Sequence, residues 1–259
     1  GAFDGLVKIS QLYMNFNQLT SLDRGLFNDT VNLQRLEAEN NVIASIESNA
    51  FLGLVNLRLL YLRNNLIKLI EPETYTNLVK LGELYLTSNL IKEIPTGSFV
   101  NLANLEKLYL GSNLISSIGE NAFFNLPILV TLDLSNNKLQ LIKNYYFKNL
   151  DSLVTLNLNK NGINLIETGS FQSLTKAELI DLSDNFILII EPGAFKSEKF
   201  LFYWVIIEKG INLKCNFHLG LNSKSLLLRK NQFEHLKGYF FTDSQIRAIN
   251  LENIGLTSL

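Results

Sequence analysis

Apolar residues and asparagine recur along this chain at a fixed spacing, which is clearest in residues 105–126, LEKLYLGSNLISSIGENAFFNL. This stretch reads L-x-x-L-x-L-x-x-N-x-I-x-x-I-x-x-x-x-F-x-x-L, and the same frame returns every 24 residues. We number the positions of the frame as slots, with slot 1 at the first leucine. A period of this length indicates a repeat protein in which each unit buries its apolar edge only against its neighbours.

Nine successive repeat starts lie 24 residues apart, and two less regular starts follow. The regular repeats occupy residues 9–200 and the irregular repeats occupy residues 201–259. We therefore expect a single domain over residues 1–259 with about eleven repeats. The frame is already under way at Phe3 and is interrupted at Leu259, which favours a fragment of a longer protein. The starts are Ile9, Leu33, Leu57, Leu81, Leu105, Leu129, Leu153, Ala177, Leu201, Ser223 and Ile246.

Slots 3 to 7 have the alternation of a short strand. Apolar residues at slots 4 and 6 alternate with polar or variable residues at slots 3, 5 and 7, as in Leu108-Tyr109-Leu110. A period of two places one face toward a core and the other toward solvent. Stacked repeats align such strands into a parallel sheet with neighbouring strands about 4.8 Å apart. The side chains of slots 3, 5 and 7 then share one face of that sheet.

Two further slots predict columns of buried side chains. Slot 9 is asparagine in nine repeats, and its amide can pair with backbone groups where the chain leaves the sheet. Slot 19 is phenylalanine or tyrosine in most repeats, and we expect these rings to stack edge to face. The asparagines are Asn17, Asn41, Asn65, Asn89, Asn113, Asn137, Asn161, Asn185 and Asn231. The rings are Phe3, Phe27, Phe51, Tyr75, Phe99, Phe123, Phe147, Phe171 and Phe195.

This frame resembles the leucine-rich repeat family, specifically its typical 24-residue class, over essentially the whole chain. The resemblance implies an α/β repeat solenoid. In that fold a curved horseshoe carries a concave parallel β-sheet, and loops, turns and short helical segments back the sheet. Spines of asparagine and phenylalanine belong to the same class.

The resemblance also implies a function. The class is common in extracellular animal proteins, such as Toll-like receptors, Slit-like guidance proteins and secreted insect immune proteins. It therefore implies that the concave face binds a protein ligand or co-receptor, in innate immunity, receptor signalling or adhesion. An intracellular scaffold or an enzyme inhibitor, like the leucine-rich ribonuclease inhibitors, is the alternative.

Composition excludes several other classes of protein. The 23 basic and 24 acidic residues leave a net charge of −1, without the basic surplus that a nucleic-acid binder needs. No apolar run is long enough to span a membrane. The single cysteine, Cys215, excludes an internal disulfide or a cysteine-rich zinc site. His218 and His235 have no metal-ligating companions, so we expect no metal, no cofactor and no enzymatic activity.

Three consecutive tyrosines at slot 5, Tyr61, Tyr85 and Tyr109, are the first candidates for partner contacts. Tyrosine combines a rigid apolar ring with a polar tip and is enriched at binding hot spots. The alternative is a stacked ladder that only stabilises neighbouring strands, and the two interpretations are compatible. Charged residues of both signs lie beside the tyrosines, and a solvated face is the alternative for any single one of them. They are Arg35, Arg58, Arg63, Glu83, Glu106 and Lys107, of which Arg63, Glu83 and Lys107 are taken as candidate contacts.

Later repeats supply further candidates. Asp133 and Asp181 make the same face acidic, which can orient a charged partner. The frame places four apolar residues at outward slots of the strand at 201–207, with Trp204 and Ile206 pointing inward. Exposed apolar clusters usually mark interaction surfaces, here for a partner or for homo- or hetero-dimerisation, unless an intramolecular lid covers them. The four outward residues are Phe202, Tyr203, Val205 and Ile207.

Residues 28–30, Asn-Asp-Thr, form the chain's N-glycosylation sequon, with Asn28 as the acceptor. A used sequon requires passage through the secretory pathway. Asn28 therefore mildly favours an extracellular glycoprotein.

Overall fold

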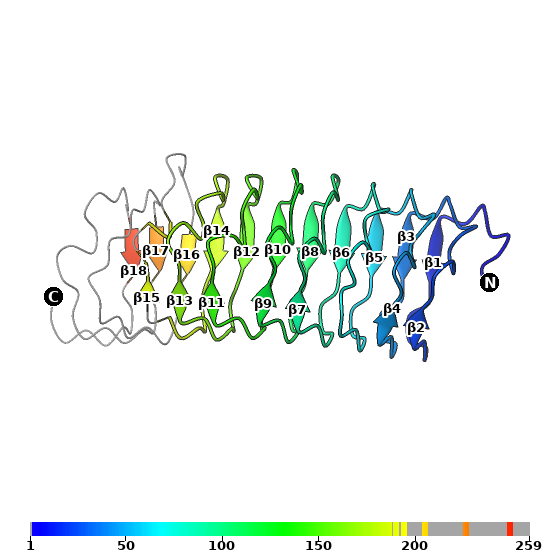
Figure 1. Ribbon diagram of the computed structural model, residues 1–259, viewed down its shortest axis with the longest axis horizontal. Coiled ribbons are helices and arrows are strands. Elements are labelled where there is room, and N and C mark those ends of the chain that lie inside the picture. Colours follow the sequence, from blue (N-terminus) through cyan, green and yellow to red (C-terminus); the bar gives the residue numbers. More distant parts are fainter. Residues whose placement is uncertain are drawn as a thin grey trace. The chain divides into compact units, whose positions relative to one another are not determined.

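The computed structural model describes residues 2–187, 189–191 and 193–195, together with three later strands (Figure 1). It divides the chain into two compact units, residues 1–132 and residues 133–259. In both units short parallel strands stack coil upon coil, as the repeat frame predicts. In the regular repeats, each strand of the main sheet occupies slots 3 to 5.

The main-sheet strands follow one another in chain order within each unit. In the first unit these are β1 (Gln11–Tyr13), β3 (Arg35–Glu37), β5 (Leu59–Tyr61), β6 (Glu83–Tyr85) and β8 (Lys107–Tyr109). In the second unit they are β12 (Thr155–Asn157), β14 (Leu179–Asp181), β16 (Trp204–Ile206), β17 (Ser225–Leu227) and β18 (Ala248–Asn250). The strand β10 (Thr131–Asp133) spans the boundary between the units.

Two-residue strands at slots 13 and 14 form a second row within each unit (Figure 1). In the first unit β2 (Ser21–Leu22) pairs with β4 (Ser45–Ile46), and β7 (Glu93–Ile94) pairs with β9 (Ser117–Ile118). In the second unit β11 (Leu141–Ile142), β13 (Leu165–Ile166) and β15 (Ile189–Ile190) pair in that order.

The described residues contain no helix, so the short helical segments expected behind the sheet are absent there. Backbone conformation explains the difference. Asn49, Asn121 and Gly169, all at slot 17, have positive φ values of 64°, 57° and 76°. Left-handed residues of this kind interrupt a right-handed helical turn as soon as it begins. The segments between the short strands and the next repeat are consequently turns.

The core lies between the two rows of strands. In the repeat that begins at Leu105, the slot 4 and slot 6 side chains of Leu108 and Leu110 are fully buried. From the short strand β9, Ile118 is also buried, whereas its neighbour Ser117 is exposed. The frame repeats this pattern from coil to coil, so the apolar interior is continuous within each unit.

The asparagine column is confirmed for the described repeats after the first, in which Asn17 is exposed. From Asn41 to Asn185 every slot 9 asparagine is buried. Asn65 is typical: its Oδ1 accepts the backbone N–H of Ile43 at 3.0 Å. Its Nδ2 donates to the carbonyls of Ala38 at 2.9 Å and Leu62 at 3.1 Å. Nδ2 also donates to the Arg63 carbonyl at 3.1 Å, so one amide pairs four backbone groups, two of them in the preceding coil.

The aromatic column is buried from Phe27 to Phe195, as expected, whereas Phe3 at its start is half-buried. Its rings stack face to face and not edge to face. Tyr75 and Phe99 have centroids 5.6 Å apart and ring planes only 16° from parallel. The angle between Phe27 and Phe51 is 12°. Successive coils are related almost by translation, which carries one ring onto the next without turning it. Offset parallel stacking is also a favourable aromatic geometry.

The register of β16 departs from the 24-residue frame. That frame aligns Val205 with Asp181, but the structure pairs Val205 with Ile180 and Ile206 with Asp181. One additional residue therefore lies between β14 and β16, and the predicted register is wrong at this point. The following strands β17 and β18 pair as the irregular repeat starts predict, with Ser225 opposite Ala248.

Candidate functional site

The centre of the candidate site is a ladder of three tyrosines on the polar face of the main sheet, from strands β5, β6 and β8. Tyr61 lies 4.5 Å from Tyr85 and Tyr85 lies 4.7 Å from Tyr109, measured between ring centroids, and both pairs are within 7° of parallel. The three residues are direct partners in the strand register, so their spacing is the spacing of the strands. All three side chains are half-buried, which leaves part of each ring accessible.

Two arginines cover the faces of this ladder. The Arg63 guanidinium carbon lies 4.0 Å from the centroid of Tyr85, and that of Arg35 lies 4.6 Å from the centroid of Tyr61. Cation–π contacts of this kind are worth about 0.5–1 kcal/mol at exposed sites. The sequence places Arg35 beside the tyrosines but does not single it out as a candidate contact. Its slot 3 position, diagonal to a slot 5 tyrosine on the next strand, was the signal that could have indicated it.

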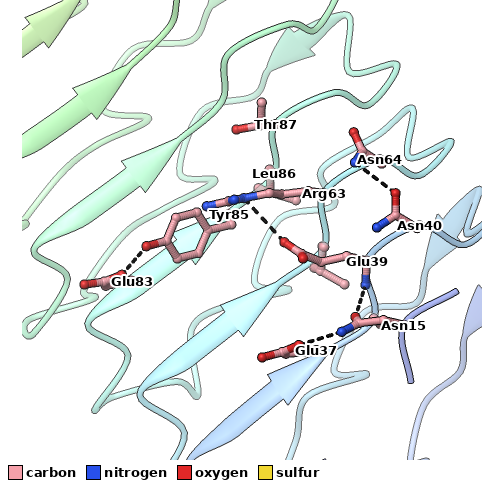
Figure 2. A network of polar contacts seen from close by, with 12 residues as sticks. Asn15, Glu37, Glu39, Asn40, Arg63, Asn64, Glu83, Tyr85, Leu86 and Thr87 are labelled. Atoms are coloured by element: carbon pink, nitrogen blue, oxygen red, sulfur yellow. Dashed lines mark hydrogen bonds and ion pairs between the residues drawn. The ribbon is translucent and has the colours of Figure 1, made fainter. Parts of the chain in front are cut away.

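Carboxylates hold both arginines in place. Glu37 contacts Arg35 at 2.5 Å and also accepts a hydrogen bond from Asn15. Glu39 Oε1 lies 3.4 Å from Arg63 Nε, which is ion-pair distance without hydrogen-bond geometry (Figure 2). Burial raises the pKa of Glu39, and the charge of Arg63 opposes that rise. The arginines are therefore positioned in advance over the rings.

Glu83 joins the tyrosine ladder to Lys107. It accepts hydrogen bonds from the Tyr85 hydroxyl (Figure 2) and, at 3.0 Å, from Lys107 Nζ. Burial opposes ionisation of Glu83, but these two donors outweigh it and lower the carboxyl pKa. Burial, and then the bond to Glu83, raise the pKa of Tyr85, so the phenol remains protonated.

The lowered pKa of Glu83 gives a testable pH dependence. Its stabilising contribution is present above the ordinary pKa of 4.5 and is lost as the pH falls through the lowered value. In a Lys107→Met variant the burial remains and one donor is removed, so we expect the Glu83 pKa to rise. Carboxyl ¹³C NMR across the acid range measures it, with the exposed Lys92→Met as the control. An unchanged Glu83 pKa in Lys107→Met would contradict the assignment.

The remaining predicted site residues make other contacts. In β10, Asp133 accepts the N–H of Ser135 at 2.9 Å. In the second unit, Asp181 accepts Asn159 Nδ2 at 2.9 Å. Asn28 is exposed in the first unit. Phe202, Tyr203 and Ile207, and the side chain of Val205, lie outside the described residues, as do Cys215, His218 and His235.

Two negative findings concern the part of the chain that the structure describes. Within it, no group of three or more histidine, cysteine, aspartate or glutamate side chains could hold a metal ion. The same residues include no helix long and apolar enough to cross a membrane.

Comparisons with known proteins place the fold in a family. The leucine rich repeat family model matches residues 32–91, 80–139, 103–163, 129–187 and 151–203. No curated protein sequence matches. Among solved structures, a chain from the crystal structure of a TLR13–ssRNA13 complex is similar, with a TM-score of 0.78 and 22% identity. The match covers 99% of this chain but only 38% of that one. The family matches together span residues 32–203, more than half of the sequence, and the chain therefore belongs to the leucine-rich repeat family.

Proposed function

We propose that this chain is a recognition module that binds a protein partner through the polar face of its main sheet, with the tyrosine ladder at the centre of contact. The observation that carries the proposal is the half-buried stack of Tyr61, Tyr85 and Tyr109 with Arg35 and Arg63 packed on it. Tyrosine and arginine dominate binding hot spots. Side chains that are already ordered lose little further conformational entropy when a partner binds.

The charge of this face favours a protein partner over a nucleic acid. The similar solved structure is a complex of TLR13 with ssRNA13. Binding a phosphate backbone needs an excess of cations. On the first unit's polar face, three basic residues, Arg35, Arg63 and Lys107, stand beside three acidic ones, Glu37, Glu39 and Glu83. A balanced pattern of this kind suits a protein surface that carries both signs.

The contact proposal predicts a large loss of affinity when the tyrosines are removed. Replacing Tyr61, Tyr85 and Tyr109 together with serine should weaken partner binding by about a hundredfold, because hot-spot truncations cost about 2 kcal/mol or more. The partner is first captured from extracellular fluid of the source with the full-length protein. Its affinity for the wild-type and variant proteins is then measured by calorimetry.

Two controls make this result specific. A triple Tyr→Phe variant keeps the stacked rings and removes only the hydroxyl groups, so it should retain most of the affinity. An exposed apolar residue at slot 13, Leu69, is replaced with serine to test the opposite side of the coil. A folded triple-serine variant with wild-type affinity would show that the ladder is purely structural.

We further propose an extracellular setting, with a glycan on Asn28. The side chain of Asn28 is exposed, whereas Thr30 of the same sequon is buried and its hydroxyl donates to the carbonyl of Phe27 at 2.9 Å. After secretion from animal cells, we expect a mass shift that glycosidase removes and Asn28→Gln abolishes. Thr30→Ser keeps both the sequon and the hydroxyl, so it should remain glycosylated. An unmodified secreted protein would contradict the glycan and favour the intracellular alternative.

A further inference from the structure

An open hollow lies beside the tyrosine ladder, at the edge where the chain enters the main sheet. It has a volume of about 490 Å³. Its centre is slot 2, where Gly82 N donates to the carbonyl of Arg58 and Glu106 N donates to the carbonyl of Gly82, both at 2.8 Å. Gly82 therefore leaves a gap in a row of side chains, between those of Arg58 and Glu106. The lining residues are Arg58, Leu59, Lys80, Gly82, Glu83, Asn104 and Glu106.

The backbone does not require glycine at this position. A Cβ on Gly82 would lie 3.5 Å from the Arg58 carbonyl oxygen, which is ordinary van der Waals contact, and its φ is not left-handed. Equivalent slots in two later repeats hold Val130 and Val154. Glycine at the edge of a strand weakens it and often marks a place where another chain approaches closely. The hollow is thus a property of the side chains chosen here and not of the coil geometry.

The walls of the hollow carry exposed charges of opposite sign. Within the described residues, the Arg58 guanidinium and the Glu106 carboxylate make no hydrogen bond or ion pair, although the Glu106 charge acts on the neighbouring Lys107. Their neighbours are already engaged: Lys80 donates to Asn56 at 2.7 Å, and Asn104 donates to the Val79 carbonyl at 2.6 Å. Two strand spacings separate the backbones of Arg58 and Glu106, which is about 10 Å.

The hollow is continuous with the tyrosine ladder. Glu83 lines it and also accepts the hydrogen bond of Tyr85. A partner that lies across the rings can therefore reach the hollow with a projecting segment. On the other side of Arg58, a smaller hollow of about 210 Å³ also uses Leu59 as a wall, which leaves the arginine side chain with space on both sides.

The geometry points to a specificity pocket: the Gly82 hollow receives a projecting loop of the protein partner, which presents an acidic side chain to Arg58 and a basic side chain to Glu106. This inference rests on the proposed function and adds the chemistry of the partner. The floor accepts the loop because Leu59 and the bare backbone of Gly82 offer apolar contact. The charged walls set the order of its charges and exclude loops of a single sign.

A phage-displayed library of short random loops, each closed by a disulfide, tests the pocket directly on the folded full chain. Loops that bind the wild-type chain should bind Gly82→Val about tenfold less, because the valine fills the hollow. The enriched loops should pair one acidic with one basic residue. Panning on Glu106→Lys, which makes both walls cationic, should enrich loops with two acidic residues instead.

Gly162→Val is the matched control for folding. A Cβ on Gly162 would also lie 3.5 Å from a carbonyl oxygen of the preceding coil, that of Leu139, and Gly162 lines neither of these two hollows. Equal binding to Gly82→Val and wild type, or no charge pattern among the enriched loops, would overturn the pocket. Loops that lose binding on the triple Tyr→Ser variant but not on Gly82→Val would overturn it while leaving the proposed function intact. Loops that bind the triple Tyr→Ser variant as well as the wild type but do not bind Gly82→Val would support the pocket and contradict the proposed role of the tyrosines.

Discussion

Replacing Phe99 with alanine should destabilise the protein by about 3–5 kcal/mol, the cost of a large cavity in a packed core. Phe99 is fully buried and stacks between Tyr75 at 5.6 Å and Phe123 at 5.9 Å. Its removal takes a ring from the middle of the aromatic column and leaves both neighbours with one unfilled face. Urea unfolding followed by far-UV circular dichroism measures the free energy of unfolding.

An exposed phenylalanine, Phe124, provides the control for this experiment. Phe124 follows directly after a column ring, but its own side chain is 46% exposed. Phe124→Ala should therefore cost about 1 kcal/mol or less, within the range of surface substitutions. Equal losses at Phe99 and Phe124 would mean that the aromatic column does not carry the stability assigned to it.

Gly119→Ala should cost about 3 kcal/mol, even though it adds a single methyl group. A Cβ on Gly119 would lie 2.4 Å from the backbone nitrogen of Thr96 and 2.9 Å from the carbonyl carbon of Pro95. The two coils approach this closely because Gly119 N donates to the Ile94 carbonyl at 2.7 Å. Backbone atoms cannot rotate away as a side chain can, so the coils must separate.

Gly82→Ala is the matched control, because its Cβ would meet the preceding coil at an ordinary 3.5 Å. The two variants differ in the space available and not in chemistry. Thermal and urea unfolding should show Gly82→Ala close to the wild type and Gly119→Ala clearly weaker. Similar stability of the two variants would mean that the coils at Gly119 have room to relax.

The positions of the strands and buried columns could be predicted because each repeat imposes its pattern on the next. Leu108 and Leu110 are buried and Tyr109 is half-buried, as a period of two requires. Asn113 is buried and donates to the carbonyls of Leu86 and Leu110 at 3.0 Å. These outcomes depend only on which slot a residue occupies, and the sequence contains that information.

Other features depend on the orientation of individual side chains, which the repeat frame does not predict. The parallel stacking of Phe27 on Phe51, with ring planes 12° apart, depends on the orientation of each ring, which its slot does not determine. The repeat frame predicts which tyrosines form the cluster. It does not predict that Arg63 lies over the ring of Tyr85, because that contact also needs a particular rotamer of the arginine. The hollow at Gly82 exists because glycine has no side chain, and the periodicity of apolar residues does not predict such a hollow.

A local change of length is the third kind of feature that periodicity misses. A repeat count assumes that each coil has the same number of residues. The pairing of Asp181 with Ile206 shows 25 residues between equivalent positions, where the frame expects 24. Because strand faces alternate, a single extra residue exchanges the two sides of a strand.

The asparagine column also determines how the array can change in length. Each buried asparagine reaches back by one coil: Asn89 pairs with Ile67 and Leu62 of the preceding coil and with Leu86 of its own. Removing a complete set of 24 residues from the regular repeats brings the next asparagine against the same backbone groups. Loss of a single residue instead changes the spacing between one asparagine and its acceptors in the preceding coil, such as the 27 residues that separate Leu62 from Asn89. A whole coil, cut at any slot, is thus the unit that this fold can gain or lose without rebuilding its core.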